Sequence, residues 1–221
     1  MSLPSILAAF NADISPLEVE IGVFVRGRPS PGLRSTFALR DECVLEGILS
    51  RVWQVWCKFC RDSIFESLLG TSTVSGTMIP RHPAALSAEH VSAAAINASK
   101  SRQPEKYWGA KNDSLRREPT WGDVDVLTDI VSRLSPLNAG QLLAAYSASW
   151  ASAKALRTIR NASAHFNAQS MTEVQNLGTS YVTYPILHPT HAMFWAEPVS
   201  GDFLVTHAIH NLKSHGALSV Q

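Results

Sequence analysis

Charged residues are scarce in this sequence of 221 residues. Aspartate, glutamate, lysine and arginine make up 17% of the chain, whereas hydrophobic residues make up 45%. This composition excludes a disordered chain as the ordinary expectation, because the apolar side chains suffice to build a core. The net charge is only +1, so a strongly basic nucleic-acid-binding protein is excluded as well. Any contact with RNA must therefore come from a local patch of positive charge.

Cysteine is also rare, because Cys43, Cys57 and Cys60 are the three in the chain. An odd number argues against a framework of disulfide bonds. Cys57 and Cys60 form a CxxC pair, but no second Cys or His pair at zinc-ligand spacing lies nearby, so we interpret both as core and surface residues of a helix. The sequence further lacks an internal repeat, a glycine-rich phosphate loop and a nucleophile elbow. We therefore expect no metal and no cofactor.

Long hydrophobic runs are missing too. No apolar run approaches the roughly 18–20 residues that a membrane-spanning helix needs. The first ten residues are mildly apolar, but they lack the basic start and the cleavage site of a signal peptide. We therefore expect a cytoplasmic protein that does not contact a membrane, with one domain or one domain and an appendage.

Helical periodicity dominates what the sequence does contain. Apolar residues recur every three or four positions in several long stretches, which is typical of amphipathic helices. Thr120 with Asp123, and Asn138 with Gln141, are typical of residues that cap the start of a helix. The predicted helices cover residues 35–69, 87–99, 120–134, 138–165, 166–177 and 202–215.

Two stretches depart from the helical pattern. Apolar and polar residues alternate from Leu17 to Arg26, which predicts a β-strand. Residues 181–196 are rich in aromatics and interrupted by prolines, which indicates an extended segment. We therefore predict a mainly α fold, a helical bundle with irregular or small β extensions at both termini. Its parts would be an N-terminal extension (1–35), the helical domain (36–180) and a C-terminal extension packed on the same domain (181–221).

The helix predicted from residue 138 ends in an unusual polar motif, Arg160-Asn161-Ala162-Ser163-Ala164-His165. Arginine is a permanent cation with a planar fork of donors that suits phosphate oxygens. Histidine titrates near neutral pH and can donate or accept a proton, and Asn161 can orient either side chain. Positions five apart on a straight helix point about 140° apart. Either the helix breaks between Arg160 and His165, or a second copy of the motif completes the site across a symmetric interface.

This motif resembles the signature of the HEPN superfamily, an arginine, four to six residues and a histidine, commonly with asparagine directly after the arginine. The preceding helix, Gln141 to Ile159, and the segment from Glu118 to Gly122 also look like the prokaryotic HEPN nucleases of defence and toxin systems. The resemblance extends over roughly residues 37–170. It implies a HEPN-like helical bundle that acts as a homodimer and cleaves RNA without a metal, leaving a 2′,3′-cyclic phosphate and a 5′-OH. An antitoxin or sensor protein would restrain it.

The chemistry of RNA cleavage fits the same residues. Without a metal, the reaction needs a base for the ribose 2′-OH, an acid for the leaving 5′-oxygen and a cation for the phosphorane. His165 can serve as base or acid, and Arg160 can neutralise the developing charge. The resemblance makes these two the catalytic pair and Asn161 an accessory. One motif supplies a single histidine, so a two-fold dimer would supply the missing partner.

Basic residues near the motif are candidates for binding the RNA backbone. Lys154, Arg157 and Arg160 form a positive ridge on the predicted helix. Part of that charge interacts favourably with the helix C-terminus, and part can bind phosphate. Residues 100–119, which include Arg116 and Arg117, are either a solvated loop or a basic lip beside the site. The Tyr107-Trp108 pair in this segment can stack a base or anchor the loop to the core.

Two other interpretations remain open at this point. His165 can instead cap the last helical turn while Arg160 pairs with an acid such as Glu173. The chain would then be a catalytically inactive HEPN-like module that binds a partner protein. A metal-dependent phosphohydrolase could instead use the two histidine pairs at three-residue spacing, but no third ligand is fixed by the sequence, so we interpret these as surface histidines. The pairs are His188 with His191 and His207 with His210.

Overall fold

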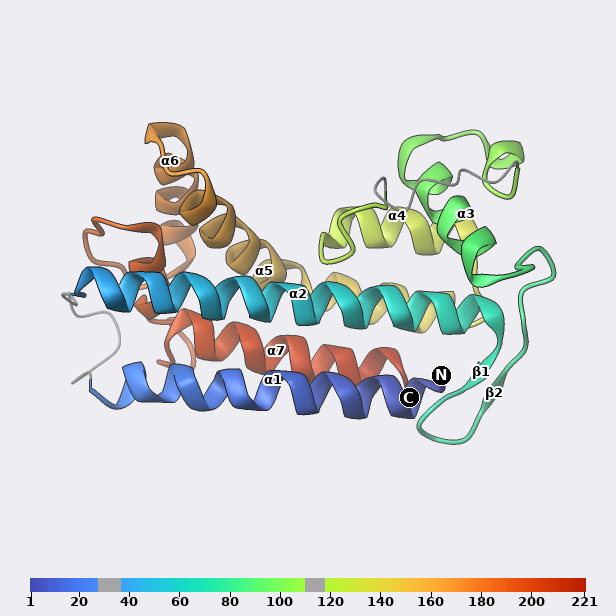
Figure 1. Ribbon diagram of the computed structural model, residues 1–221, viewed down its shortest axis with the longest axis horizontal. Coiled ribbons are helices and arrows are strands. Elements are labelled where there is room, and N and C mark those ends of the chain that lie inside the picture. The colour runs from blue at the N-terminus through green and yellow to red at the C-terminus, as the bar shows by residue number, and fades with distance from the viewer. Residues whose placement is uncertain (28–36, 110–117) are drawn as a thin grey trace. The chain divides into compact units, whose positions relative to one another are not determined.

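The computed structural model describes residues 1–27, 37–109 and 118–221 (Figure 1). The structure is mainly helical, which confirms the predicted fold class. Its helices are α1 (Leu3–Arg26), α2 (Leu39–Leu69), α3 (Ala88–Lys100), α4 (Val124–Leu134), α5 (Ala139–Ala164), α6 (Ala168–Leu177) and α7 (Leu204–Ser219), with the 3₁₀ helices η1 (Pro104–Lys106), η3 (Gly178–Ser180) and η4 (Pro189–Phe194). Strands β1 (Thr71–Ser72) and β2 (Met78–Ile79) pair antiparallel. Within these ranges, no helix has the length and hydrophobicity that crossing a bilayer requires.

The described chain forms two compact units. The first unit contains Met1–Asn11, Trp56–Trp150 and Lys213–Gln221, and the second contains Ala12–Val55 and Ala151–Leu212. The four longest helices, α1, α2, α5 and α7, each contribute residues to both units. The polar motif, at the C-terminal end of α5, belongs to the second unit. The predicted division of the chain near residues 35 and 180 stays a prediction.

The strand predicted from Leu17 to Arg26 is wrong, because these residues form the second half of α1. The buried residues of α1 follow a helical stripe, Leu3, Ile6, Phe10, Ile14 and Ile21. The valines that create the alternating pattern lie outside this stripe, and Val19 and Val23 are exposed. Both periods were present in the sequence, and the longer helical stripe determined the structure because it buries more side chains.

Aromatic side chains of α2 fill the core of the first unit. Phe59 packs against Phe10 of α1 with ring centroids 4.6 Å apart, and Trp56 meets the edge of Tyr146 from α5 at 6.3 Å. Trp56 is fully buried, and Trp53, in the second unit, is buried as well. Both tryptophans are therefore core residues.

The segment after α3 is anchored to the first unit by Trp108. Its indole stacks on His82 with ring centroids 4.9 Å apart and meets the edge of His90 at 5.5 Å. Tyr107 is buried. Of the two roles considered for this aromatic pair, anchoring the loop is the one that these contacts support.

Two helices begin differently from the prediction. Helix α4 starts at Val124 with Asp123 as its N-cap, whose side chain accepts a hydrogen bond from the N–H of Asp125. Thr120 therefore precedes the helix by several residues. Before α5, the Oδ1 of Asn138 has no hydrogen-bond partner, and its Nδ2 donates to Ser67 instead. The predicted capping role of Asn138 is wrong because this side chain ties the start of α5 to α2.

Candidate functional site

The polar motif occupies the last turn of α5, as its position in the sequence predicted. Helix α5 ends at Ala164, and the N–H of His165 still donates to the carbonyl of Asn161 at 2.9 Å. The helix therefore does not break between Arg160 and His165. Among the described residues no hydrogen bond joins these two side chains, so a single copy of the motif leaves them directed to different sides of the helix.

Arg160 carries a guanidinium with no carboxylate partner in the described part of the chain. Its Nη1 donates to the Oδ1 of Asn161 at 3.1 Å, and its buried Nε has no hydrogen-bond partner. Glu173, the acid that the sequence offered as a partner, accepts a hydrogen bond from Gln169 Nε2 at 3.4 Å. Because no acid among the described residues pairs with Arg160, its positive charge remains available to attract an anion.

His165 is held by its backbone, while its side chain is exposed. The carbonyl of His165 accepts hydrogen bonds from Asn167 Nδ2 at 2.9 Å and from Ser170 Oγ at 2.8 Å. Within the described ranges, its imidazole makes no hydrogen bond or ion pair. The interpretation that the His165 side chain caps the final turn is therefore wrong. The main chain fixes the position of this residue and leaves both ring nitrogens available.

The start of α6 explains why the backbone of His165 is so well held. Asn167 is the N-cap of α6 and forms a capping box, in which its side chain accepts from the N–H of Ser170 and the Ser170 hydroxyl accepts from the N–H of Asn167. The same two side chains reach back to the carbonyl of His165. The α5–α6 junction is therefore a connected set of hydrogen bonds around residue 165.

The structure describes two of the four other residues predicted to bind RNA. On α5, Lys154 is exposed and lies about two turns before Arg160, and Arg157 is half-buried and lies about one turn before it. Their role in binding RNA stays a prediction. Arg116 and Arg117 lie outside the described residues. A cavity of about 480 Å³ lies in the second unit at the end of α6, with Gln175, Thr183 and Trp195 among its lining residues. Of the predicted catalytic and RNA-binding residues that the structure describes, none lines this cavity.

The histidines considered as metal ligands have protein partners instead. His191, which is buried, approaches Glu42 Oε1 with its Nε2 at 2.8 Å, and His188 approaches Glu46 Oε1 in the same way at 3.2 Å. The interpretation of these two as surface histidines is therefore wrong for His191. Glu42 and Glu46 lie one turn apart on α2, so the two pairs tie η4 to that helix.

The second pair of histidines lies on α7. His207 contacts the side chain of Asn211 through Nε2 at 2.8 Å, and His210 is exposed. Across the described ranges, no group of three or more His, Cys, Asp or Glu residues is arranged to hold a metal ion.

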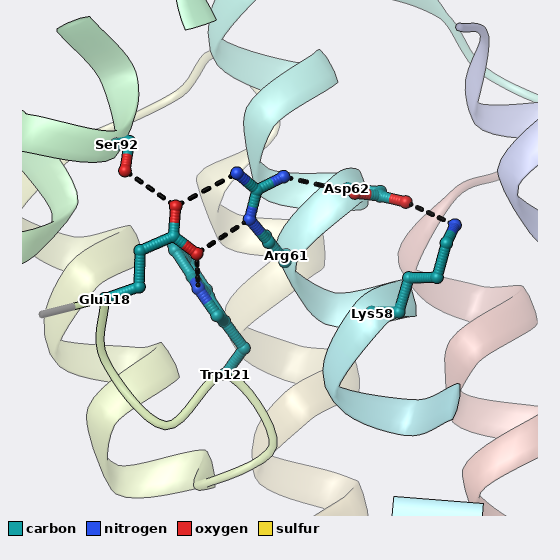
Figure 2. Close-up of polar contacts among 6 residues, drawn as sticks. All are labelled: Lys58, Arg61, Asp62, Ser92, Glu118 and Trp121. Carbon is teal, nitrogen blue, oxygen red and sulfur yellow. Dashed lines mark hydrogen bonds and ion pairs between the residues drawn. The ribbon is translucent and has the colours of Figure 1, made fainter. Parts of the chain in front are cut away.

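The segment from Glu118 to Gly122, which contributed to the HEPN resemblance, has a structural role in the first unit. Figure 2 shows the Glu118 carboxylate between Arg61 and Ser92, with the indole of Trp121 donating to it. Arg61 donates twice, at 2.9 and 3.0 Å, and Ser92 and Trp121 donate at 2.7 and 3.0 Å. These bonds use the oxygens of the carboxylate, so Glu118 is not available as a catalytic acid or base.

The electrostatics of Glu118 follow from these contacts. Burial by itself would raise the pKa of the carboxyl, but hydrogen bonds from Arg61, Ser92 and Trp121 together outweigh it and lower the pKa below its usual value. The carboxylate is therefore ionised at neutral pH. The Glu118 bonds also raise the pKa of the Arg61 guanidinium, against the effect of its partial burial.

Sequence reasoning missed Phe166, the residue that follows His165. Its side chain is 58% exposed, and its ring lies against the ring of His188 with centroids 5.7 Å apart. The only sequence signal was an aromatic residue next to the motif. The contact with His188 joins residues that are distant along the chain, so no local pattern could indicate it.

Comparison of the chain with protein-family models, curated proteins and solved structures gave no match.

Proposed function

We propose that this protein is a metal-independent endoribonuclease that cleaves RNA through the ribose 2′-OH. In this mechanism His165 transfers protons to or from the reacting oxygens, and Arg160 binds the non-bridging oxygens of the phosphate. Asn161 accepts a hydrogen bond from Arg160 and orients its fork. The products would be a 2′,3′-cyclic phosphate and a 5′-OH. The HEPN-like motif suggests a toxin or effector of a prokaryotic defence or toxin–antitoxin system, with an antitoxin or sensor protein as partner.

The observation that carries the proposal is that, among the described residues, the side chain of His165 has no hydrogen-bond partner and that of Arg160 has no carboxylate partner. Buried polar groups that serve only the fold are nearly always paired, whereas the buried Nε of Arg160 has no hydrogen-bond partner. The imidazole of His165 has no partner among the described residues, whereas its backbone carbonyl accepts two hydrogen bonds. Arg160 has no carboxylate partner in the part of the chain that the structure describes. A fixed backbone with unpaired functional groups supports a reactive site better than a structural one.

The continuous helix also favours a site built from two copies. Because α5 does not break between Arg160 and His165, one copy cannot direct both side chains at the same atom. A two-fold pair of chains would place the arginine of one copy near the histidine of the other, and would supply the second histidine that acid–base catalysis uses. We therefore expect a homodimer in solution, with a mass about twice the 24.1 kDa of one chain, measured by light scattering.

An RNA cleavage assay in EDTA tests the proposal. Wild-type protein should cut a labelled RNA and leave a terminus that is a cyclic phosphate by mass spectrometry. His165→Ala and Arg160→Ala should each slow cleavage by roughly 10²-fold or more, because each removes a group that acts in the transition state. His210→Ala is the matched control, since His210 is another exposed histidine of the second unit, and it should cleave normally. Equal rates for all four proteins would exclude the proposal.

The alternative function is a catalytically inactive HEPN-like module that binds a partner protein. It predicts a dimer or a hetero-complex in which the polar motif is buried and paired. The same assay separates the two functions. No metal-independent cleavage by the wild-type dimer, together with unchanged partner binding by His165→Ala, would support the module.

A further inference from the structure

We propose that Phe166 forms a stacking subsite for an unpaired nucleobase beside His165, so that the substrate is single-stranded RNA. This inference rests on the proposed ribonuclease function and adds a substrate class to it. Unpaired bases are commonly bound by stacking on aromatic side chains, whereas bases inside an RNA duplex are stacked on one another and not accessible to such a ring.

The first step is that Phe166 is exposed where an ordinary phenylalanine would be buried. Its side chain is 58% exposed, although phenylalanine is among the residues most often found in cores. It follows His165 directly, between the end of α5 and the N-cap of α6. Because Asn167 and Ser170 hold the carbonyl of His165, the backbone on both sides of Phe166 is fixed.

The second step is that the ring of Phe166 is supported from one side. It lies against the imidazole of His188 with centroids 5.7 Å apart and an angle of 38° between the rings. His188 is itself held, because its Nδ1 contacts Thr190 Oγ1 at 2.8 Å and its Nε2 contacts Glu46 at 3.2 Å. The ring therefore has a fixed support on one side and an open surface, which reduces the entropy lost when a base stacks on it.

The third step is the chemistry of the surroundings. The residues next to Phe166 in the chain are Ala164, His165 and Asn167, all exposed and either small or polar. His165 and Asn167 therefore place a polar side chain on each side of Phe166 in the chain. Arg160, a permanent cation, lies six residues earlier on α5. Aromatic rings combined with cationic and polar side chains are the groups that bind single-stranded nucleic acid.

The proposed subsite would position the substrate for the reaction. A base held on Phe166 fixes its own ribose within reach of the neighbouring residue, and that residue is His165. Phe166 would thus contact the substrate without exchanging a proton, and it would contribute mainly to binding. Its loss should raise KM or Kd, whereas the loss of His165 should lower the rate of cleavage.

A binding experiment with an uncleavable probe tests the subsite. The probe is a labelled single-stranded RNA whose 2′-oxygens are methylated, and its Kd is measured by fluorescence anisotropy. Phe166→Leu keeps an apolar side chain but removes the ring, and it should weaken binding about tenfold, since stacking of one base is typically worth a factor of this size or more. Val199→Ala, at an apolar position of the same unit that is 92% exposed, is the matched control and should bind like wild type.

Further arms distinguish the possible failures. His210→Ala should bind the probe like wild type, and a duplex of the same sequence should bind Phe166→Leu and wild type equally. If Phe166→Leu binds the single strand as tightly as wild type while wild type still cleaves RNA, the subsite is excluded and the proposed function stands. If wild type neither binds nor cleaves RNA, both fail. If Phe166→Leu instead lowers the mass in solution, Phe166 is a protein contact and the subsite is excluded.

Discussion

Glu118 illustrates how single residues stabilise the first unit. Its carboxylate accepts two hydrogen bonds from Arg61 and one each from Ser92 and Trp121, and the ion pair is only partly exposed. Glu118→Gln removes the charge and cannot accept all of these bonds. We expect it to lower the free energy of unfolding by about 1–3 kcal/mol, the usual range for hydrogen bonds to charged groups. Urea denaturation at neutral pH measures the change.

The stabilisation by Glu118 should depend on pH. Because the folded state lowers the pKa of this carboxyl, its contribution is fully present above the pKa of the unfolded chain and is lost as the pH falls through the folded pKa. The difference in the free energy of unfolding between wild type and Glu118→Gln should therefore be largest near neutral pH. It should become smaller in acid, below about pH 4. Glu105→Gln, which changes an exposed glutamate of η1, should show no such difference. If the difference in unfolding free energy between wild type and Glu118→Gln stayed constant down to strongly acidic pH, this explanation would be contradicted.

At the scale of elements, the junction between α5 and α6 connects local structure to the candidate site. Asn167→Ala removes the N-cap of α6 and one hydrogen bond to the carbonyl of His165, and it should destabilise the helix by about 1 kcal/mol. We expect faster hydrogen exchange in the first turn of α6 and slower RNA cleavage, because residue 165 loses part of its support. Asn176→Ala, near the other end of α6, is the control and should change neither. Loss of the cap with full activity would show that the site does not depend on this junction.

The elements also show what the sequence could and could not indicate. Helices α2, α3 and α6 were predicted to within a few residues, because long apolar stripes at one period leave no competing interpretation. The second half of α1 was mistaken for a strand because Val19 and Val23 added an alternating pattern to the helical one. The capping role expected of Asn138 failed because its amide bonds to Ser67, a residue of another helix. Such tertiary contacts leave no trace in local sequence.

The candidate site, too, was predictable from the sequence only in part. The motif itself was visible in the sequence, and its position in the last turn of α5 followed from the helical period. The pairs that His188 and His191 form with Glu46 and Glu42 were not predictable, because they join segments far apart in the chain. The exposure of Phe166 is likewise a property of the folded chain alone.

At the scale of the whole molecule, the two units should unfold together. Helices α1, α2, α5 and α7 each run through both units, and turns of a helix stabilise one another cooperatively. We therefore expect one thermal transition, with coincident curves from far-UV circular dichroism and tryptophan fluorescence. Fluorescence reports on both units, because Trp56 and Trp121 belong to the first and Trp53 and Trp195 to the second. Two separate transitions would contradict this prediction.

Because the imidazole at position 165 carries none of the hydrogen bonds of its junction, replacing it with a small side chain such as alanine should leave the fold intact. Under the proposed ribonuclease function, a single base change in the gene could then produce an inactive protein with the same fold. If the chains act in pairs, that protein would exchange into mixed dimers holding one competent histidine instead of two. If an inactive variant were co-expressed in excess, most active chains would be in mixed dimers. The variant would then act as a dominant-negative inhibitor.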